Sequence, residues 1–246
     1  MEPLIQFFFL FAVGVIAGTL NILAGGGSFI TLPVLIFLGL PATAANATNR
    51  ISIVLQNTSA LWGFERRKVI PWRETIIDST LPALAGSIVG ALMAMRVEDA
   101  AFKKFLAVAM VILSLWTLLG KGREEELARR IPLWGTRFAF LLIGVYSGFV
   151  QAGVGFFVLT LTTLGGLTLV TGNAVKIVVL LATNLLALAI FQSGGVVHWG
   201  LGLSLASGSI IGGQLGVRLA VLKGHAWLRW IVTSAIIIFA IKLWIG

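Results

Sequence analysis

The sequence predicts an all-α integral membrane protein that crosses the bilayer several times and consists of two internal repeats. Hydrophobic residues make up 58% of the chain and charged residues only 11%, and the mean hydropathy is +1.02. No soluble domain needs this much apolar surface. The second observation is a pattern of polar and glycine residues that occurs in both halves. Such duplication is typical of transporters whose site lies between the repeats.

Long apolar stretches follow one another along almost the whole chain, and each of the longer ones can cross a hydrocarbon core of about 30 Å. They cover approximately residues 4–24, 29–40, 44–64, 75–95, 101–119, 134–163, 171–193, 200–222 and 227–245. The polar segment 121–132 is predicted to link a first repeat, about 1–120, to a second, about 133–246. We therefore expect one transmembrane domain over residues 1–246.

Three sets of matching residues carry the duplication. The segment 45–50 (ANATNR) and the later Asn57, Phe64 and Trp72 match the segment 172–176 (GNAVK) and the later Asn184, Phe191 and Trp199. Glycines at four-residue spacing also match, and this spacing favours close helix packing. In these glycine sets Gly14 and Gly18 match Gly144 and Gly148, and Gly86 and Gly90 match Gly212 and Gly216.

The basic residues predict the topology, because they concentrate on the cytoplasmic side of membrane proteins. If 4–40 and 134–165 are hairpins that enter and leave on one side, each half keeps three true crossings. One side then carries Arg66, Arg67, Lys68, Arg73, Lys121, Arg123, Arg129, Arg130, Arg137, Lys176, Arg218, Lys223 and Arg229, and the other carries Arg96, Lys103, Lys104 and Lys242.

An odd number of crossings inverts the second half relative to the first, with both termini outside the cytoplasm. In the alternative, the first stretch of each half crosses once, and the basic residues then divide poorly. The net charge of +9 follows from the same loops, so no nucleic-acid partner is expected.

The predicted hairpins turn at glycines. Gly25, Gly26 and Gly27 stand between Asn21 and Ser28, and each glycine costs a helix about 1 kcal/mol. Broken backbone at membrane depth is tolerated only inside protein or beside a cavity. In the second half the corresponding residues are Gln151, Gly153, Gly155 and Phe156. The N–H groups at the half-helix starts near Ser28 and Phe156 suit an anion. Alternatively, the glycines only let helices pack closely.

Arg50 and Lys176 are cations within apolar stretches, where a charge needs an anionic partner or a wet cavity. Helical spacing places Asn46, Asn49 and Asn57 on one face with Arg50, and Asn173 and Asn184 on one face with Lys176. Gln56 is a further polar residue near Arg50 in the sequence. Asp78 is the only carboxylate within a span, so we expect the substrate to supply the missing negative charge. In the alternative, the cations extend to the headgroups, and Asn57 and Asn184 hold helices together.

Other classes of function find little support. The chain contains no cysteine and only two histidines, and these histidines lack metal-ligand spacing. No nucleophile stands with a base and an orienting group, and no phosphate-binding loop pattern is present. We therefore expect no enzyme activity, no cofactor and no metal.

The segment 18–30 (GTLNILAGGGSFI) with Pro33, the segment 47–50 (ATNR) and the pair Gln56 and Asn57 closely resemble the TauE/SafE family. These are sulfite and organosulfonate exporters, also grouped as the 4-toluene sulfonate uptake permease family. The resemblance spans the whole chain, although the second-half segments 148–155 and 173–176 are looser and lack a second glycine triplet. It implies transport of small sulfur-containing anions such as sulfite, sulfoacetate or related sulfonates across the bacterial inner membrane.

The sequence therefore predicts a multi-pass secondary transporter that works by alternating access between the repeats. Its expected partners are a small anionic substrate and the lipid bilayer, with a coupling proton and a homo-oligomer as possibilities. The alternatives are a passive anion channel and a non-transporting accessory membrane subunit. The candidate substrate-binding residues are Asn21, Gly25, Gly26, Gly27, Ser28, Asn49, Arg50, Gln56, Asn57, Gln151, Gly153, Gly155, Phe156, Asn173, Lys176 and Asn184.

Overall fold

A computed structural model describes residues 3–24, 26–119, 131–222 and 242 of the chain. Gly25 of the expected glycine turn lies outside the described residues. Most of the linker and most of the last apolar stretch, 227–245, also lie outside them. The same is true of several basic residues used to predict the topology: Lys121, Arg123, Arg129, Arg130, Lys223, Arg229 and the side chain of Arg218.

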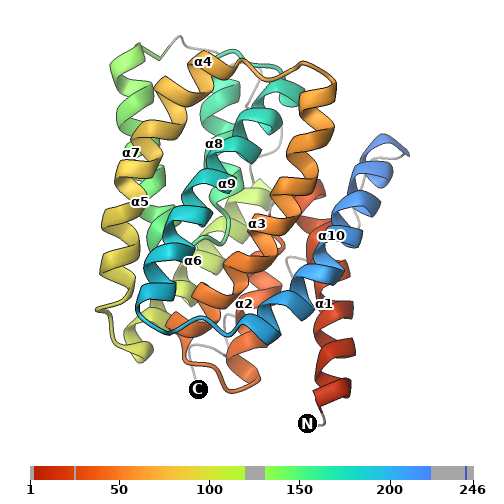
Figure 1. The fold of residues 1–246 in the computed structure, drawn as a ribbon. Coiled ribbons are helices and arrows are strands. Elements are labelled where there is room, and N and C mark those ends of the chain that lie inside the picture. The colour runs from red at the N-terminus through yellow and green to blue at the C-terminus, as the bar shows by residue number, and fades with distance from the viewer. Residues whose placement is uncertain (1–2, 25, 120–130, 223–241, 243–246) are drawn as a thin grey trace.

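The described part of the chain is helical, as predicted (Figure 1). Its elements are α1 (Pro3–Ala24), α2 (Ser28–Phe37), α3 (Ala42–Arg66), α4 (Trp72–Glu74), a π-helical turn (Thr75–Thr80), α5 (Leu81–Ala94), α6 (Asp99–Leu119), α7 (Leu133–Phe149), α8 (Val154–Leu164), α9 (Leu169–Ser193) and α10 (Trp199–Leu222). Three of the described segments are long and apolar enough to cross a membrane, namely Leu4–Ile22, Trp72–Ala94 and Leu169–Ser193. The fold is that of a polytopic membrane protein.

The helix breaks occur where the glycines predict them. α1 ends at Ala24 and α2 begins at Ser28, while α7 ends at Phe149 and α8 begins at Val154. Gly153 before α8 has φ +77°, a left-handed conformation that side chains rarely adopt. In Figure 1, α1 rises from the N-terminal end and α2 returns to it, whereas α7 descends from the opposite end and α8 returns there. Each pair therefore forms a hairpin.

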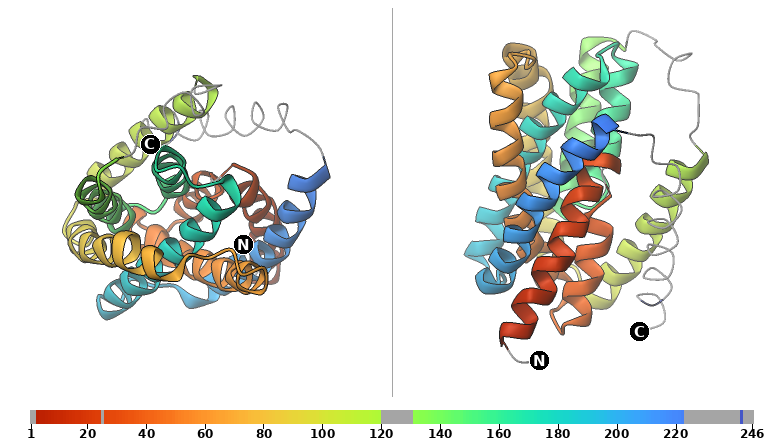
Figure 2. Two further views of the ribbon diagram at one scale, coloured as in Figure 1. Left: turned by 90° about the horizontal axis from the view of Figure 1, so that it is seen from above. Right: turned by 90° about the vertical axis from the view of Figure 1, so that its right-hand side faces the viewer.

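Two helices of the first half each pack along a helix of the second half. α1 lies along α10, and α5 lies along α7 (Figures 1 and 2). Glycines make this possible, because a Cβ atom at Gly18 would stand 2.4 Å from the Ser209 carbonyl oxygen and one at Gly90 would stand 1.9 Å from that of Val145. The close-packing interpretation of the spaced glycines is thus confirmed.

α3 and α9 cross the centre of the bundle and run in opposite directions (Figure 1). Opposite directions are what an inverted duplication requires, and the repeat relationship itself stays a prediction. Arg50 on α3 is the largest fully buried side chain among the described residues, followed by Phe29, Phe102, Phe140 and Phe191. Large apolar side chains are also exposed on the outer faces of α1, α5, α6 and α10, where lipid would cover them.

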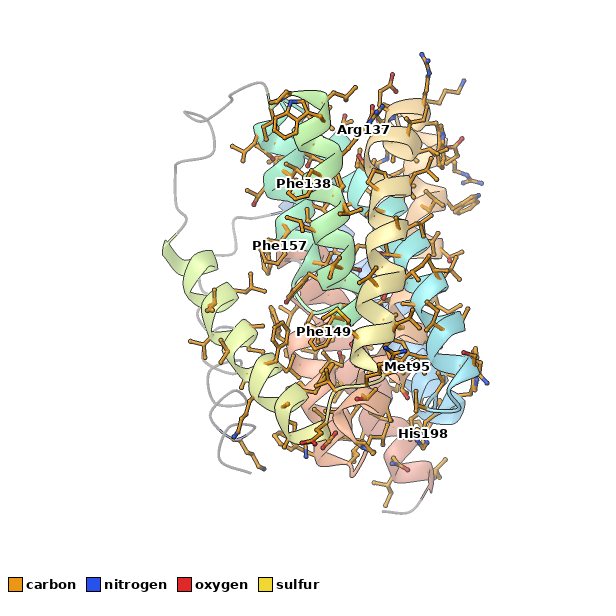
Figure 3. The ribbon with its side chains drawn as sticks, turned by 90° about the vertical axis from the view of Figure 1, so that its left-hand side faces the viewer. Met95, Arg137, Phe138, Phe149, Phe157 and His198 are labelled. Carbon is orange, nitrogen blue, oxygen red and sulfur yellow. The ribbon has the colours of Figure 1, made fainter. Side chains whose placement is uncertain are left out.

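Ion pairs lie near the two ends of the bundle. Asp78 accepts hydrogen bonds from Arg137 at 2.8 and 3.0 Å, and Arg137 lies at the opposite end of the molecule from Met95 and His198 (Figure 3). Near that other end Asp99 pairs with Lys103 at 2.8 Å and accepts a hydrogen bond from the backbone amide of Ala42 at the start of α3. The carboxylate of Asp78 is therefore engaged by a cation away from the bundle centre.

Candidate functional site

The turns of the two hairpins touch each other. Gln151 Nε2 donates a hydrogen bond to Ser28 Oγ at 2.7 Å, and both side chains are buried. A Cβ atom at Gly153 would stand 2.7 Å from the ring of Phe29, and one at Gly26 would stand 3.8 Å from the ring of Phe156. The broken backbone of both halves thus meets inside protein, which is the setting in which a membrane tolerates it.

A small polar cavity lies beside this junction, between α1, α2, α3 and α10. The space open to the centre of a water-sized sphere is about 10 Å³, close to what one water molecule needs. Its lining is Ala17, Gly18, Asn21, Gly27, Ser28, Thr31, Asn49, Ser52, Ile53, Gln56 and Ser209. The structure therefore brings five of the expected site residues together: Asn21, Gly27, Ser28, Asn49 and Gln56.

Most polar groups around this cavity already have partners within the protein. Gln56 accepts a hydrogen bond from Asn21 Nδ2 at 3.1 Å and donates one to the Gly18 carbonyl at 3.1 Å. Ser52 Oγ lies 2.6 Å from Ser209 Oγ. Asn49 is the exception, because it is fully buried and neither atom of its amide has a hydrogen-bond partner among the described residues. Such a group is costly unless something else binds it.

Arg50 points away from this cavity, toward the end of the broken helix α7. Its guanidinium donates hydrogen bonds to the Ser147 and Gly148 carbonyls at 2.9 and 2.7 Å and to Asn184 Oδ1 at 3.1 Å. It also lies over the ring of Phe191, 5.1 Å from the centroid. The side chain is fully buried and does not reach the surface of the described structure. No carboxylate of the described residues pairs with it.

The carbonyls that Arg50 binds belong to the last turn of α7. The last four carbonyls of a helix lack partners within it and carry the negative end of its dipole. Asn46, one turn before Arg50 on α3, donates to the next of these carbonyls, that of Phe149, at 2.9 Å. Together the two side chains cap α7 at the point where it breaks. Partial charges of a helix end thus compensate the charge of Arg50.

Lys176 on α9 is only 4% exposed, and among the described residues its ammonium has neither a hydrogen-bond acceptor nor an ion-pair partner. Its neighbours in sequence Val175 and Val179 pack in an apolar cluster. A buried cation in such surroundings is expensive. Lys176 is therefore the cation whose negative partner is missing from the described structure.

Some of the remaining expected residues make contacts inside the bundle, and others lie near the start of a helix. Asn184 holds Arg50, and Asn57 is buried with an unpartnered Nδ2. Asn173 donates to the Leu169 carbonyl in the first turn of its own helix. The expected free amide at Phe156 is not found, because α8 begins at Val154 and Phe156 N donates to the Gly153 carbonyl at 3.0 Å. Gly155 is buried just after that start.

Sequence reasoning left Thr31, Ser52 and Ser209 out of the expected site, although all three line the cavity. Ser52 follows Asn49 by three positions on α3, and this spacing was the available signal. Ser209 stands among the glycines of α10, which indicate only helix packing. Ser209 lines the cavity because α10 packs against α1, and the sequence does not reveal that contact.

Broken helical hairpins that meet beside a small buried cavity, inside a bundle with large apolar side chains on its outer faces, are those of a polytopic membrane protein. The sulfite exporter TauE/SafE family model matches residues 10–243. The chain belongs to this family of membrane transporters.

Several relatives cover nearly the whole chain. The probable membrane transporter protein ORF9 of a Sinorhizobium species is 30% identical over 96% of this chain and 91% of its own length. The probable membrane transporter protein YfcA of Escherichia coli K12 is 30% identical over 95% and 88%. A probable membrane transporter protein of Haemophilus influenzae is 31% identical over 89% and 87%. No solved structure matches the chain significantly.

Proposed function

We propose that the protein is a secondary transporter of the bacterial inner membrane for small sulfur-containing anions such as sulfite, sulfoacetate or other organosulfonates. Membership of the sulfite exporter family and the names of the relatives support this function. The substrate would bind between the two halves of the chain, with Lys176 as a cationic partner, and alternating exposure of that place would move it across the bilayer. A proton is the candidate coupling ion, and the protein would act without enzyme chemistry.

Lys176, a residue only 4% exposed whose ammonium has no partner among the described residues, is the observation that carries this proposal. In the described part of the chain, Asp78 and Asp99 are already paired with Arg137 and Lys103. An incoming oxyanion supplies the missing negative charge, and charge-assisted hydrogen bonds to an ammonium are among the strong ones. A cation kept ready for an arriving anion also explains why so costly a group stands on α9 between residues of an apolar cluster.

The cavity beside the hairpin junction supports gated movement over passive flow. Its space holds about one water molecule, so the described form is closed to an anion. The opposite directions of α3 and α9 (Figure 1) support the inverted duplication on which alternating access depends.

Uptake into proteoliposomes tests the proposal. We expect saturable uptake of labelled sulfite, sulfoacetate or taurine, with sulfate and chloride as comparison anions and with or without an imposed proton gradient. Lys176→Met should abolish this uptake, whereas Lys103→Met, which changes a partly exposed lysine near the end of the bundle, should leave it within about twofold of wild type.

Absence of uptake of every sulfur anion would overturn the proposed substrate class. Equal uptake by the Lys176→Met protein would overturn the assigned role of this cation. Unitary conductance steps in planar bilayers would instead show a channel.

A further inference from the structure

The cavity at the hairpin junction contains no charged side chain. The residues that line it are apolar, amide or hydroxyl residues, and Arg50, although next to Asn49 in sequence, turns toward α7. Lys176 is not among the lining residues either. Any ligand in this cavity must therefore be stabilised by neutral groups and by the backbone.

Three side chains around the cavity have unused hydrogen-bond donors, and the Oδ1 acceptor of Asn49 is unpartnered among the described residues as well. Both N–H groups of Asn49 are unpartnered within the described structure. Ser28 Oγ already accepts from Gln151, which leaves its own O–H free to donate. Asn21 Nδ2 uses one of its N–H groups for Gln56 and keeps the second. These three side chains come from α1, α2 and α3, and all three residues line the same cavity.

The start of α2 adds to this preference. α2 has ten residues and begins at Ser28, one of the lining residues, and the amides of Phe29 and Ile30 donate to the Gly26 and Gly27 carbonyls. The N-terminus of a helix carries about half an elementary positive charge and favours anions. The unpartnered and fully buried Asn49 amide is an independent sign that the space receives a polar ligand.

Neutral hydrogen-bond donors stabilise singly and doubly charged anions to different degrees. The cost of removing an anion from water grows with the square of its charge, whereas its attraction to fixed dipoles grows only in proportion to the charge. A cavity with donors and no cation therefore holds a singly charged oxyanion better than a doubly charged one. The duplication shows a difference between the halves at this position. Asn49 stands where Lys176 stands in the matching segment of the second half, so the first half has a neutral amide in place of a cation.

We propose that the cavity between α1, α2, α3 and α10 is a binding site for the head of a singly charged oxyanion, and that Asn49 makes the site reject dianions. This inference rests on the proposed function and deepens it. It narrows the proposed substrates to monoanionic sulfonates and to sulfite in its singly protonated form, and it excludes sulfoacetate, whose carboxylate adds a second charge. It also makes the two halves unequal, with a neutral site in the first and a cation in the second.

Two probes separate the charge classes. Methanesulfonate carries a single charge, and sulfate carries two. We expect wild-type proteoliposomes to take up methanesulfonate and to discriminate against sulfate. Asn49→Lys should change the sulfate-to-methanesulfonate ratio by about tenfold or more in favour of sulfate, which corresponds to about 1.4 kcal/mol. Asn49→Ala should raise the half-saturating methanesulfonate concentration by about tenfold, because it removes both amide donors.

The matched control is Gln192→Lys, which also replaces an amide by a cation but at an exposed position near the end of α9. It should leave the sulfate-to-methanesulfonate ratio unchanged. An Asn49→Lys protein that transports methanesulfonate with the wild-type ratio would overturn the inference while leaving the proposed function intact. Absence of uptake of any sulfur anion by wild type would instead reject the proposed function itself.

Wild-type protein alone provides a second test if Asn49→Lys does not fold. Sulfite changes from a monoanion to a dianion as the pH rises through neutrality, whereas methanesulfonate does not change. Without a pH difference across the membrane, sulfite uptake at fixed total concentration should fall from mildly acidic to mildly alkaline pH relative to methanesulfonate uptake. A constant ratio would contradict the assigned charge preference.

Discussion

Arg50 donates a hydrogen bond to Asn184 Oδ1 at 3.1 Å and so joins α3 to α9 at the centre of the bundle. Asn184 is fixed in turn, because its Nδ2 donates to the Leu180 carbonyl at 2.8 Å. The same guanidinium binds the end of α7 through the carbonyls of Ser147 and Gly148. One buried side chain therefore connects a helix of the first half to two helices of the second.

This network predicts that Arg50→Ala destabilises the fold. The change leaves two backbone carbonyls and an amide oxygen without donors in the interior, and each unsatisfied group costs about 1–3 kcal/mol. We expect a loss of about 3 kcal/mol or more, read as a lower midpoint of thermal unfolding in detergent. Arg50→Lys should recover part of the loss, because an ammonium keeps the charge without the planar fork of donors.

Arg137→Ala is the control for that experiment. Arg137 is half-exposed and pairs with Asp78 near the end of the bundle, where ion pairs contribute about 0–1 kcal/mol. Its unfolding midpoint should stay close to that of wild type. Equal losses for Arg50→Ala and Arg137→Ala would contradict the capping role of Arg50.

Lys176→Met is predicted to stabilise the protein while it abolishes transport. Methionine has a similar length without the charge, so the change removes an unpartnered cation from a nearly buried position. Replacing buried charges by apolar side chains often stabilises a protein by about 1–4 kcal/mol. Opposite changes in unfolding midpoint and uptake are typical of a residue kept for function. A lower midpoint would indicate that Lys176 supports the fold.

Gly90→Ala should disrupt the packing of α5 against α7. A Cβ atom at this position would stand 1.9 Å from the Val145 carbonyl oxygen and 2.7 Å from the Phe149 amide nitrogen, so the backbones must separate. We expect a loss of several kcal/mol, measured as a smaller monodisperse fraction in detergent and a lower unfolding midpoint. Gly63→Ala is the matched control, since nothing lies within 4 Å of its Cβ position. In that exposed helical position alanine should be neutral or stabilising.

The hydrogen bond between Ser28 and Gln151 should couple the two hairpin turns. In a double-mutant cycle of Ser28→Ala and Gln151→Ala, we expect a coupling free energy of about 1 kcal/mol in thermal stability. Independent effects of the two substitutions would show that this contact at 2.7 Å does not contribute to joining the hairpins.

Several parts of the fold could be read from the chain alone. The glycines at 25–27 and the residues 151–155 predict the two helix breaks, because helix propensity is a local property. Burial of Arg50 in α3 follows from its position within an apolar stretch. The spaced glycines likewise predict close helix contacts, and the structure confirms them at Gly18 and Gly90.

Other parts depend on which helix meets which, and periodicity does not contain that information. The spacing on α3 places Asn46 and Arg50 on one face, but it does not reveal that this face meets the last carbonyls of α7. The expectation that Arg50 awaits a substrate anion came from counting carboxylates, and that count overlooks the partial charge of a helix end. A role in substrate binding stays a prediction for Arg50, and it is proposed for Lys176.

The packing of α10 against α1 also limits how early in synthesis the fold can be completed. Thr19 in α1 donates to the carbonyl of Gly212 in α10, a residue 193 positions later in the chain. A ribosome adds about 5–20 residues per second, so the first helix waits on the order of ten seconds or more for the strip of glycines on which it packs. Although α1 is the first helix to be synthesised, it is thus among the last to pack against its partner helix. A chain that ends before α10 lacks that partner.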